Sequence, residues 1–197
     1  MAATGLREKK AARTRQQIVD AALDLFIQRG FDQTTMEEIA ERAEIGSSTL
    51  YRYFPSKDQV ILEPLMGFTE MGEHLRDRPA DEPLAVALGA AVKGSLVSFT
   101  TDDRVAHVRR IVDNTPGPRA KLWDVMMTSR DNLEHALGDR MGLPADHLSV
   151  VLTARTTMMV YELAAEAWWA GDHSRPILEV VDEVLAEVQA ATVVTPR

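Results

Sequence analysis

The sequence predicts an all-α protein, and three observations support this prediction. The helix-forming residues Ala, Leu, Glu, Arg and Met are abundant throughout the chain. Neither Asn-Gly nor Asp-Gly, the dipeptides typical of tight hairpin turns, joins two alternating apolar runs. Apolar residues instead recur at helical spacing between Gly, Pro and capping residues. We therefore expect about nine helices, arranged as an N-terminal three-helix domain and a larger C-terminal helical domain.

The first predicted helix spans residues 10–29. Apolar residues at helical spacing give it one buried face, formed by Ile18, Ala22, Leu25 and Phe26. Gly30 follows in the position past a helix end where a left-handed backbone is common. The helix is therefore expected to end at Arg29.

Two short helices are predicted next. Thr35 and Glu38 have the spacing of a capping box, so the second helix begins at residue 35 and continues to about residue 43. Residues 45–47, Ile-Gly-Ser, have the composition of a turn. The third helix begins at Ser48 and must stop before Pro55.

The sequence marks the helix ends less clearly in the rest of the chain. A fourth helix begins at Ser56 and is bent at Pro64. Proline, glycine and capping residues then divide the chain into further helices. The predicted ranges are 56–76, 83–101, 102–114, 119–137, 145–170 and a last helix from residue 174.

Composition excludes several classes of protein. The chain has 197 residues and no cysteine, which excludes disulfides, cysteine-ligated metals and thiol redox switches. No apolar run approaches the roughly 20 residues of a membrane helix, and the N-terminus lacks the apolar segment of a signal peptide. We expect a cytoplasmic protein that carries no metal and no cofactor and does not contact a membrane.

Charge is divided unevenly along the chain. The whole chain has a net charge of −8, but residues 1–60 contain nine basic and nine acidic residues and are neutral overall. Within them a basic N-terminal arm contains Arg7, Lys9, Lys10, Arg13 and Arg15, opposed only by Glu8. Such an arm suits contact with phosphates, although a solvated, frayed end is an alternative interpretation.

Nothing in the sequence favours an enzyme. The five histidines never have the spacing of metal ligands, and no phosphate-binding loop or nucleophile motif occurs. A hydrolase built on Ser98 and His107 is the nearest alternative, but nothing else selects it.

Residues 10–58 have the pattern of a helix-turn-helix unit, in which the second short helix enters the major groove of DNA. Residues 21–60 resemble the DNA-binding domain of the tetracycline-repressor (TetR) family. The resemblance rests on Leu-Phe followed by Arg-Gly-Phe, on Thr-Thr followed by Ile-Ala, and on Thr-Leu-Tyr-Arg-Tyr-Phe-Pro-Ser-Lys at residues 49–57.

The resemblance implies a set of DNA contacts. Small hydroxyl residues begin the reading helix, tyrosines reach phosphates, and Lys57 is a phosphate clamp at the start of the fourth helix. For Tyr53, partial packing in the core is an alternative. The expected DNA-binding residues are Arg13, Arg15, Thr35, Ser47, Ser48, Thr49, Tyr51, Tyr53 and Lys57.

The same resemblance implies that residues 1–58 bind DNA and that residues 59–197 sense a ligand and form the dimer. It also implies that the helix over 145–170 and the last helix pair with their copies in a four-helix bundle, so we expect a palindromic operator. Packing within one subunit is the alternative for the apolar residues that these two helices would bury at the dimer interface. The expected dimer residues are Val160, Ala164, Ala167, Ile177, Val181, Val184 and Val188.

A pocket for a largely apolar effector is expected in the second domain, because Met and aromatic side chains suit adaptable apolar ligands. Ordinary core packing is the alternative for each of these residues. The expected pocket residues are Met66, Phe68, Met71, Leu96, Phe99, Ile111, Trp123, Met126, Met127, Arg130, Met158, Tyr161, Glu162, Ala165 and Trp168.

These expectations together describe a dimeric repressor that a small molecule releases from DNA by moving the helix over 56–76. A ligand-independent architectural DNA binder and an activator are the alternatives that the sequence leaves open.

Overall fold

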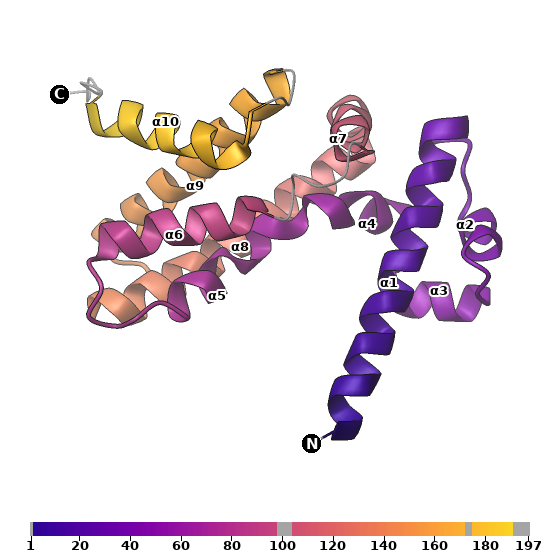
Figure 1. Ribbon diagram of the computed structural model, residues 1–197, viewed down its shortest axis with the longest axis horizontal. Helices are drawn as coiled ribbons and strands as arrows, with labels where there is room; N and C mark the ends of the chain where they lie inside the picture. The colour runs from indigo at the N-terminus through magenta and orange to yellow at the C-terminus, as the bar shows by residue number, and fades with distance from the viewer. Residues whose placement is uncertain (1, 98–103, 172–174, 191–197) are drawn as a thin grey trace. The chain divides into compact units, whose positions relative to one another are not determined.

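The structure, a computed structural model, describes residues 2–97, 104–171 and 175–190, and these segments are helical with short turns between them (Figure 1). No strand occurs in these segments, so the all-α prediction is confirmed. The elements are α1 (Ala2–Arg29), α2 (Met36–Arg42), α3 (Ser47–Tyr53), α4 (Lys57–Leu62), the 3-10 helix η1 (Glu63–Glu70), α5 (Met71–Arg76), α6 (Leu84–Val97), α7 (Arg104–Asn114), α8 (Pro116–Met141), α9 (Leu148–Ala170) and α10 (Ile177–Ala190).

The chain forms two compact units. The N-terminal unit contains residues 1–65 and 103–123, and the C-terminal unit contains residues 66–102 and 124–197. Helix α7 and the beginning of α8 therefore belong to the same unit as α1, α2, α3 and α4. The functional division at residue 58 stays a prediction.

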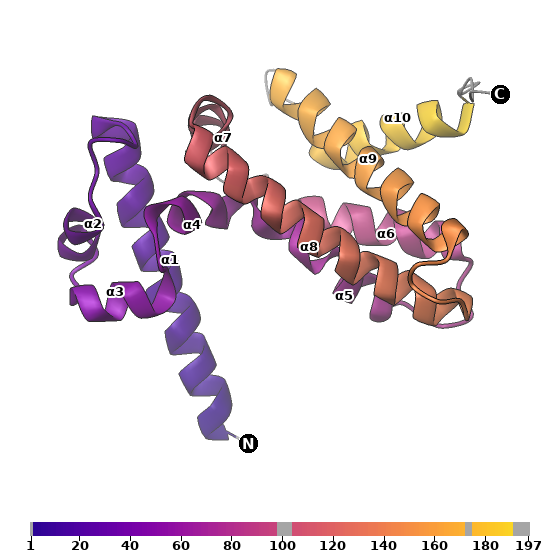
Figure 2. The same cartoon turned by 180° about the vertical axis from the view of Figure 1, so that it is seen from behind.

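A small apolar core holds α1, α2 and α3 together. Figures 1 and 2 show α2 and α3 on the same side of α1. Phe26, Ile39, Leu50 and Phe54 are at most 1% exposed. Burial of each such side chain stabilises the unit by roughly 1.5–3 kcal/mol. The three-helix core expected from the sequence is confirmed.

Local signals set most helix ends in this unit. Gly30 has φ +86, the left-handed conformation expected after α1. The capping box of Thr35 and Glu38 is present at the start of α2. Helix α3 begins at Ser47, one residue earlier than expected, because Gly46 is its N-cap. Helix α1 extends back to Ala2, so the basic arm is helical.

The predicted helix over 56–76 is interrupted. It consists of α4, η1 and α5, and Pro64 lies in η1. Proline has no backbone N–H to donate, so it removes one hydrogen bond of the α-helical pattern at this point, and the expected bend at Pro64 stays a prediction. The boundary between the two units also falls within η1.

Helix α8 is longer than predicted. It begins at Pro116 instead of Arg119 and ends at Met141. Proline is favoured in the first helical turn, where its missing N–H has no acceptor within the helix. Pro116 and Pro118 therefore lie in the first turn of α8, and the predicted gap over residues 115–118 is reduced to Thr115.

In the C-terminal unit, α6, α9 and α10 pack on one another and α5 packs on α6. Gly72 on α5 lies close to α8, since a Cβ there would be 3.1 Å from the carbonyl oxygen of Asn132. Arg140 donates hydrogen bonds to the carbonyl groups of Arg78, Pro79 and Glu82. Within the described ranges, no helix combines the length and apolar character needed to cross a membrane.

Candidate nucleic-acid interface

Helix α3 presents a polar face above the three-helix core. Ser47, Ser48 and Tyr51 are exposed, whereas Thr49 is half-buried and Leu50 is fully buried. Small hydroxyl groups accept or donate hydrogen bonds to several base edges. The structure therefore brings the expected reading residues together on one exposed face, with Thr49 at its margin.

Tyr51 has a partner on the neighbouring helix. Its phenolic hydroxyl donates a hydrogen bond to the carboxylate of Glu37 on α2 over 3.2 Å. Desolvation, this hydrogen bond and the charge of Glu37 together raise the pKa of Tyr51 above its ordinary value. An acidic group thus stands beside the expected reading face, and Tyr51 must leave it to reach a phosphate.

Arg52 is an exposed cation on α3 that the sequence reasoning did not assign to DNA contact. Its guanidinium carbon lies 5.7 Å from the ring centroid of Tyr53, and Tyr53 itself is half-buried. Arg52 follows Ser48 by four residues, the spacing that places two side chains on the same helix face. This spacing is the sequence signal that could have identified Arg52 as a DNA contact.

The half-burial of Tyr53 supports the alternative of partial core packing for this residue.

Lys57 is held differently from the phosphate clamp that was expected. Its ammonium donates to the carbonyl oxygens of Phe31 at 2.8 Å, Asp32 at 3.3 Å and Thr34 at 3.0 Å. An ammonium has three N–H donors, so all of them have acceptors in the loop between α1 and α2. The structure thus gives Lys57 a positioning role in this loop.

The hydroxyl and the backbone N–H of Thr35 also have hydrogen-bond partners within the protein. Its hydroxyl accepts from the backbone N–H of Glu38 at 3.2 Å, and its own N–H donates to the Glu38 carboxylate at 2.9 Å. Hydrogen bonds from the Thr35 backbone and side chain lower the pKa of Glu38 below its ordinary value. The Glu38 carboxylate therefore lies beside Thr35 at the start of α2, and the expected contact of Thr35 with DNA stays a prediction.

The two arginines expected in the basic arm differ. Arg15 pairs with Glu63, and its guanidinium lies 4.5 Å from the ring centroid of Phe54. The hydrogen bond to Glu63 raises the pKa of Arg15. Arg13 is exposed and has no ion pair among the described residues. Arg13 therefore keeps its charge available for a phosphate, whereas Arg15 joins the end of α3 to the segment after α4.

The residues expected to line an effector pocket are divided between the two units. Ile111 and Trp123 belong to the N-terminal unit, and Trp123 is 58% exposed. Phe99 lies outside the described residues. Met127 is exposed, while Met66, Met126, Arg130 and Glu162 are half-buried. The buried members of the set are Phe68, Met71, Leu96, Met158, Tyr161, Ala165 and Trp168.

Contacts within the C-terminal unit fix several of these side chains. The ring centroids of Phe68 and Tyr161 are 5.8 Å apart, and the Trp168 indole donates to the carbonyl of Arg175 at 3.0 Å. The Nε of Arg130 lies 3.5 Å from the carboxylate of Glu134. These contacts are compatible both with a pocket wall and with an ordinary core.

The stripe expected at a dimer interface lies mostly inside the subunit. Val160 and Ala164 on α9 and Ile177 and Val181 on α10 are buried, and α9 packs on α10. Val184 and Val188 are half-buried, and Ala167 is exposed. These burial values agree with the alternative of packing within one subunit for at least the four buried residues.

A different apolar stripe of α9 is exposed. Its members follow one another at spacings of four, seven and four residues, which places them along one helix face. They are 41–69% exposed. The residues are Leu148, Leu152, Met159 and Leu163, and we call this set the α9 stripe.

Comparison with known proteins gives a consistent family. The model of bacterial regulatory proteins of the tetR family matches residues 18–63, and the MftR C-terminal domain matches residues 82–192. The transcriptional regulator TcmR of Streptomyces glaucescens is 35% identical over 150 residues, which are 72% of this chain and 66% of TcmR. The chain thus spans slightly less than two thirds of TcmR. MftR of Mycobacterium tuberculosis is 25% identical over 88% of both chains.

Solved structures share the fold. FadR of Bacillus halodurans has a TM-score of 0.64 at 19% identity, covering 91% of this chain and 96% of its own. FadR of Bacillus subtilis has a TM-score of 0.60 at 20% identity, covering 88% and 96%. The second family model alone covers more than half of the chain. The chain is therefore a transcriptional regulator, not an enzyme, and belongs to the TetR family of bacterial regulatory proteins.

Proposed function

We propose that this regulator is a dimeric repressor that reads a palindromic operator in the cytoplasm with α3. Residues 1–58 supply DNA contact, and residues 59–197 supply dimerisation and effector sensing. The observation that carries the proposal is the exposed face of Ser47, Ser48, Tyr51 and Arg52 on a helix anchored by the buried side chain of Leu50. Such an arrangement suits insertion into the major groove.

Phosphate contacts are assigned to the first turns of α1. Arg7, Lys9, Lys10 and Arg13 are exposed there, and Glu8 is the one acidic residue among them. Each phosphate that these side chains neutralise releases condensed counterions, so binding weakens as salt rises. This arm compensates for the low charge of α3, where Arg52 is the basic residue.

Dimerisation is assigned to the α9 stripe. Exposed leucine and methionine side chains along one helix face favour association, because their burial removes apolar surface from water. Association through one face with its own copy gives a two-fold axis, and a two-fold dimer reads two symmetry-related half-sites. The operator is therefore an inverted repeat.

Effector release is assigned to the C-terminal unit, with its buried Phe68, Met71, Met158 and Tyr161. The similar B. subtilis FadR is described in complex with stearoyl-CoA, and long acyl chains are the class of apolar ligand that we propose to test first. The 3-10 geometry of η1 supports a movable connection, since such segments often mark hinges.

Selection from a random duplex library tests the DNA-binding proposal. The full-length chain should enrich inverted repeats, and Arg52→Ala should weaken binding to the enriched site more than Arg29→Ala, an exposed arginine at the end of α1. Recovery of unrelated sequences without enrichment would favour an architectural binder instead.

Titration of the selected complex tests release. Stearoyl-CoA should dissociate the complex, whereas coenzyme A alone should not. In a reporter assay the wild-type protein should lower transcription from a promoter that carries the site. An increase in transcription would identify an activator.

A further inference from the structure

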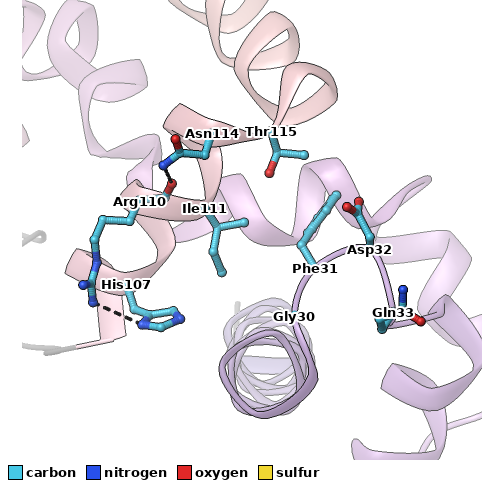
Figure 3. Close-up of a pocket in the computed structure, with 9 residues that line it drawn as sticks. All are labelled: Gly30, Phe31, Asp32, Gln33, His107, Arg110, Ile111, Asn114 and Thr115. Carbon is cyan, nitrogen blue, oxygen red and sulfur yellow. Dashed lines mark hydrogen bonds between the residues drawn. The ribbon is translucent and has the colours of Figure 1, made fainter.

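A groove of about 550 Å³ lies within the N-terminal unit, between the α1–α2 loop and α7 (Figure 3). Phe31, Asp32 and Gln33 line it from the loop, and His107, Arg110 and Ile111 line it from α7. Figure 3 shows Ile111 projecting toward the space between the two walls, with His107 and Arg110 on one side and Asp32 and Gln33 on the other. None of the residues that line the groove belongs to α3 or to the C-terminal unit.

Both walls of the groove are fixed within the unit. The loop wall is held by the three hydrogen bonds of Lys57 and by the Thr34 hydroxyl, which donates to the carbonyl of Gly30 at 2.9 Å. On the other side, Arg104 at the start of α7 pairs with Asp20 of α1 at 2.6 Å. A ligand would enter a preformed site and would not have to order a loop.

The α7 end of the groove is suited to a carboxylate. Arg110 is exposed, and its guanidinium lies 3.2 Å from Nδ1 of His107. A guanidinium only donates hydrogen bonds, so Nδ1 of His107 is the acceptor in this contact. In the part of the chain that the structure describes, Arg110 has no ion pair, whereas the adjacent Arg109 pairs with Asp113 at 3.0 Å.

The remaining lining defines the rest of the ligand. Phe31 and Ile111 provide apolar surface, and Asp32 and Gln33 provide a carboxylate and an amide on the loop side. A carboxylate of the ligand would pair with Arg110, an apolar body would cover Ile111, and a hydroxyl would donate to Asp32. Inorganic anions would leave the apolar surface unused.

We propose that this groove is a ligand site for a small hydroxyaryl carboxylic acid, distinct from the effector site assigned to the C-terminal unit. The loop wall leads directly into α2, the helix that supports α3, so occupancy would reinforce the position of the reading unit. The binding proposal itself does not depend on repression, dimerisation or operator symmetry.

Nuclear magnetic resonance of the full-length chain, labelled at Ile methyl groups and backbone amides, provides the test. Titration with 4-hydroxybenzoate should shift the Ile111 methyl and the amides of residues 30–33 in a saturable manner. The amide analogue 4-hydroxybenzamide and inorganic phosphate should bind at least about tenfold more weakly, as expected for loss of one charge-assisted hydrogen bond or of the apolar contact.

Matched variants on α7 complete the test. Arg110→Gln should weaken the binding of 4-hydroxybenzoate by about tenfold or more, whereas Arg109→Gln should change the Kd of this ligand by less than about twofold. Arg110→Lys should recover only part of the affinity, because an ammonium lacks the planar fork. Absence of saturable shifts at Ile111, equal affinity for the amide analogue or for phosphate, or an unaltered Kd in Arg110→Gln would each overturn the proposal. If the protein does not bind the acid, and if Arg110→Gln binds DNA more weakly and with a lower salt dependence than the wild type, Arg110 would be identified as a DNA phosphate contact instead.

Discussion

The ammonium of Lys57 lies 2.8 Å from the carbonyl oxygen of Phe31 and 4.5 Å from the centroid of the same residue's ring. Two further carbonyl groups of the α1–α2 loop complete its hydrogen bonds. The side chain therefore joins the start of α4 to the loop that precedes α2. Its charge is directed into the protein, and we therefore predict that its effect on DNA binding is indirect.

Substitution Lys57→Met should lower the free energy of unfolding by about 1–3 kcal/mol, because carbonyl groups that accept from a charged donor lose their partner. The salt dependence of DNA binding should stay at the wild-type slope. Urea unfolding and binding isotherms at several salt concentrations measure these two quantities. If the slope fell by about one with stability unchanged, Lys57 would be a phosphate contact.

Substitution Glu37→Gln should tighten DNA binding about two- to fivefold at 0.1 M salt, since it removes a negative charge beside α3 and weakens the hold on the Tyr51 hydroxyl. Glu41→Gln, on the same helix, is the matched control. Fluorescence anisotropy with the selected operator gives the affinities. An unchanged or weaker affinity in Glu37→Gln would show that Glu37 does not restrain Tyr51.

Substitution Thr35→Ala should cost about 1 kcal/mol in the free energy of unfolding through loss of the N-cap of α2. Urea unfolding at neutral pH measures this cost. Exposed Thr128 on α8 offers a control position, since Thr128→Ala removes a hydroxyl that caps no helix. Equal effects of the two substitutions would contradict a specific capping role.

The capping box should also make stability depend on pH. Because the folded pKa of Glu38 is depressed below its ordinary value of 4.5, its ionised form stabilises the fold fully above pH 4.5. That contribution is lost as the pH falls through the lower folded pKa. The difference in unfolding free energy between wild type and Glu38→Gln should therefore shrink with acidification, and a difference that grew would have the wrong sign.

Substitution of Leu152 and Leu163 by Glu should convert the protein to a monomer at micromolar concentration, because association would bury unpaired charges. Val86→Glu on α6 is the control, since Val86 is 55% exposed outside the α9 stripe. Sedimentation velocity measures the oligomeric state. Retention of the wild-type dimer in the double variant would place the interface elsewhere.

The helix-turn-helix unit could be predicted from sequence because its signals are local. Gly30 ends α1, and Thr35 and Glu38 are three residues apart. Lys57 shows the limit of such reasoning, since its acceptors lie 23 to 26 residues away and are backbone atoms. A basic residue at a helix start has the same local pattern whether it contacts DNA or the protein itself.

The C-terminal unit was harder to predict because α9 is apolar on more than one face. Val160 and Ala164 pack within the subunit, whereas Leu152 and Leu163 are exposed. Helical periodicity identifies each stripe but not the surface that covers it, because that depends on tertiary packing. The interruption of the helix over 56–76 had a local cause in Pro64, but the extent of η1 did not.

The most direct test of the central claim is the base preference of a Ser48→Asn variant, determined by selection from the same random library. If α3 reads base edges in a two-fold dimer, the preferred base should change at one pair of symmetry-related positions, since asparagine favours adenine in the major groove. A uniform loss of affinity with the wild-type consensus retained, or a change in only one half of the site, would contradict the account.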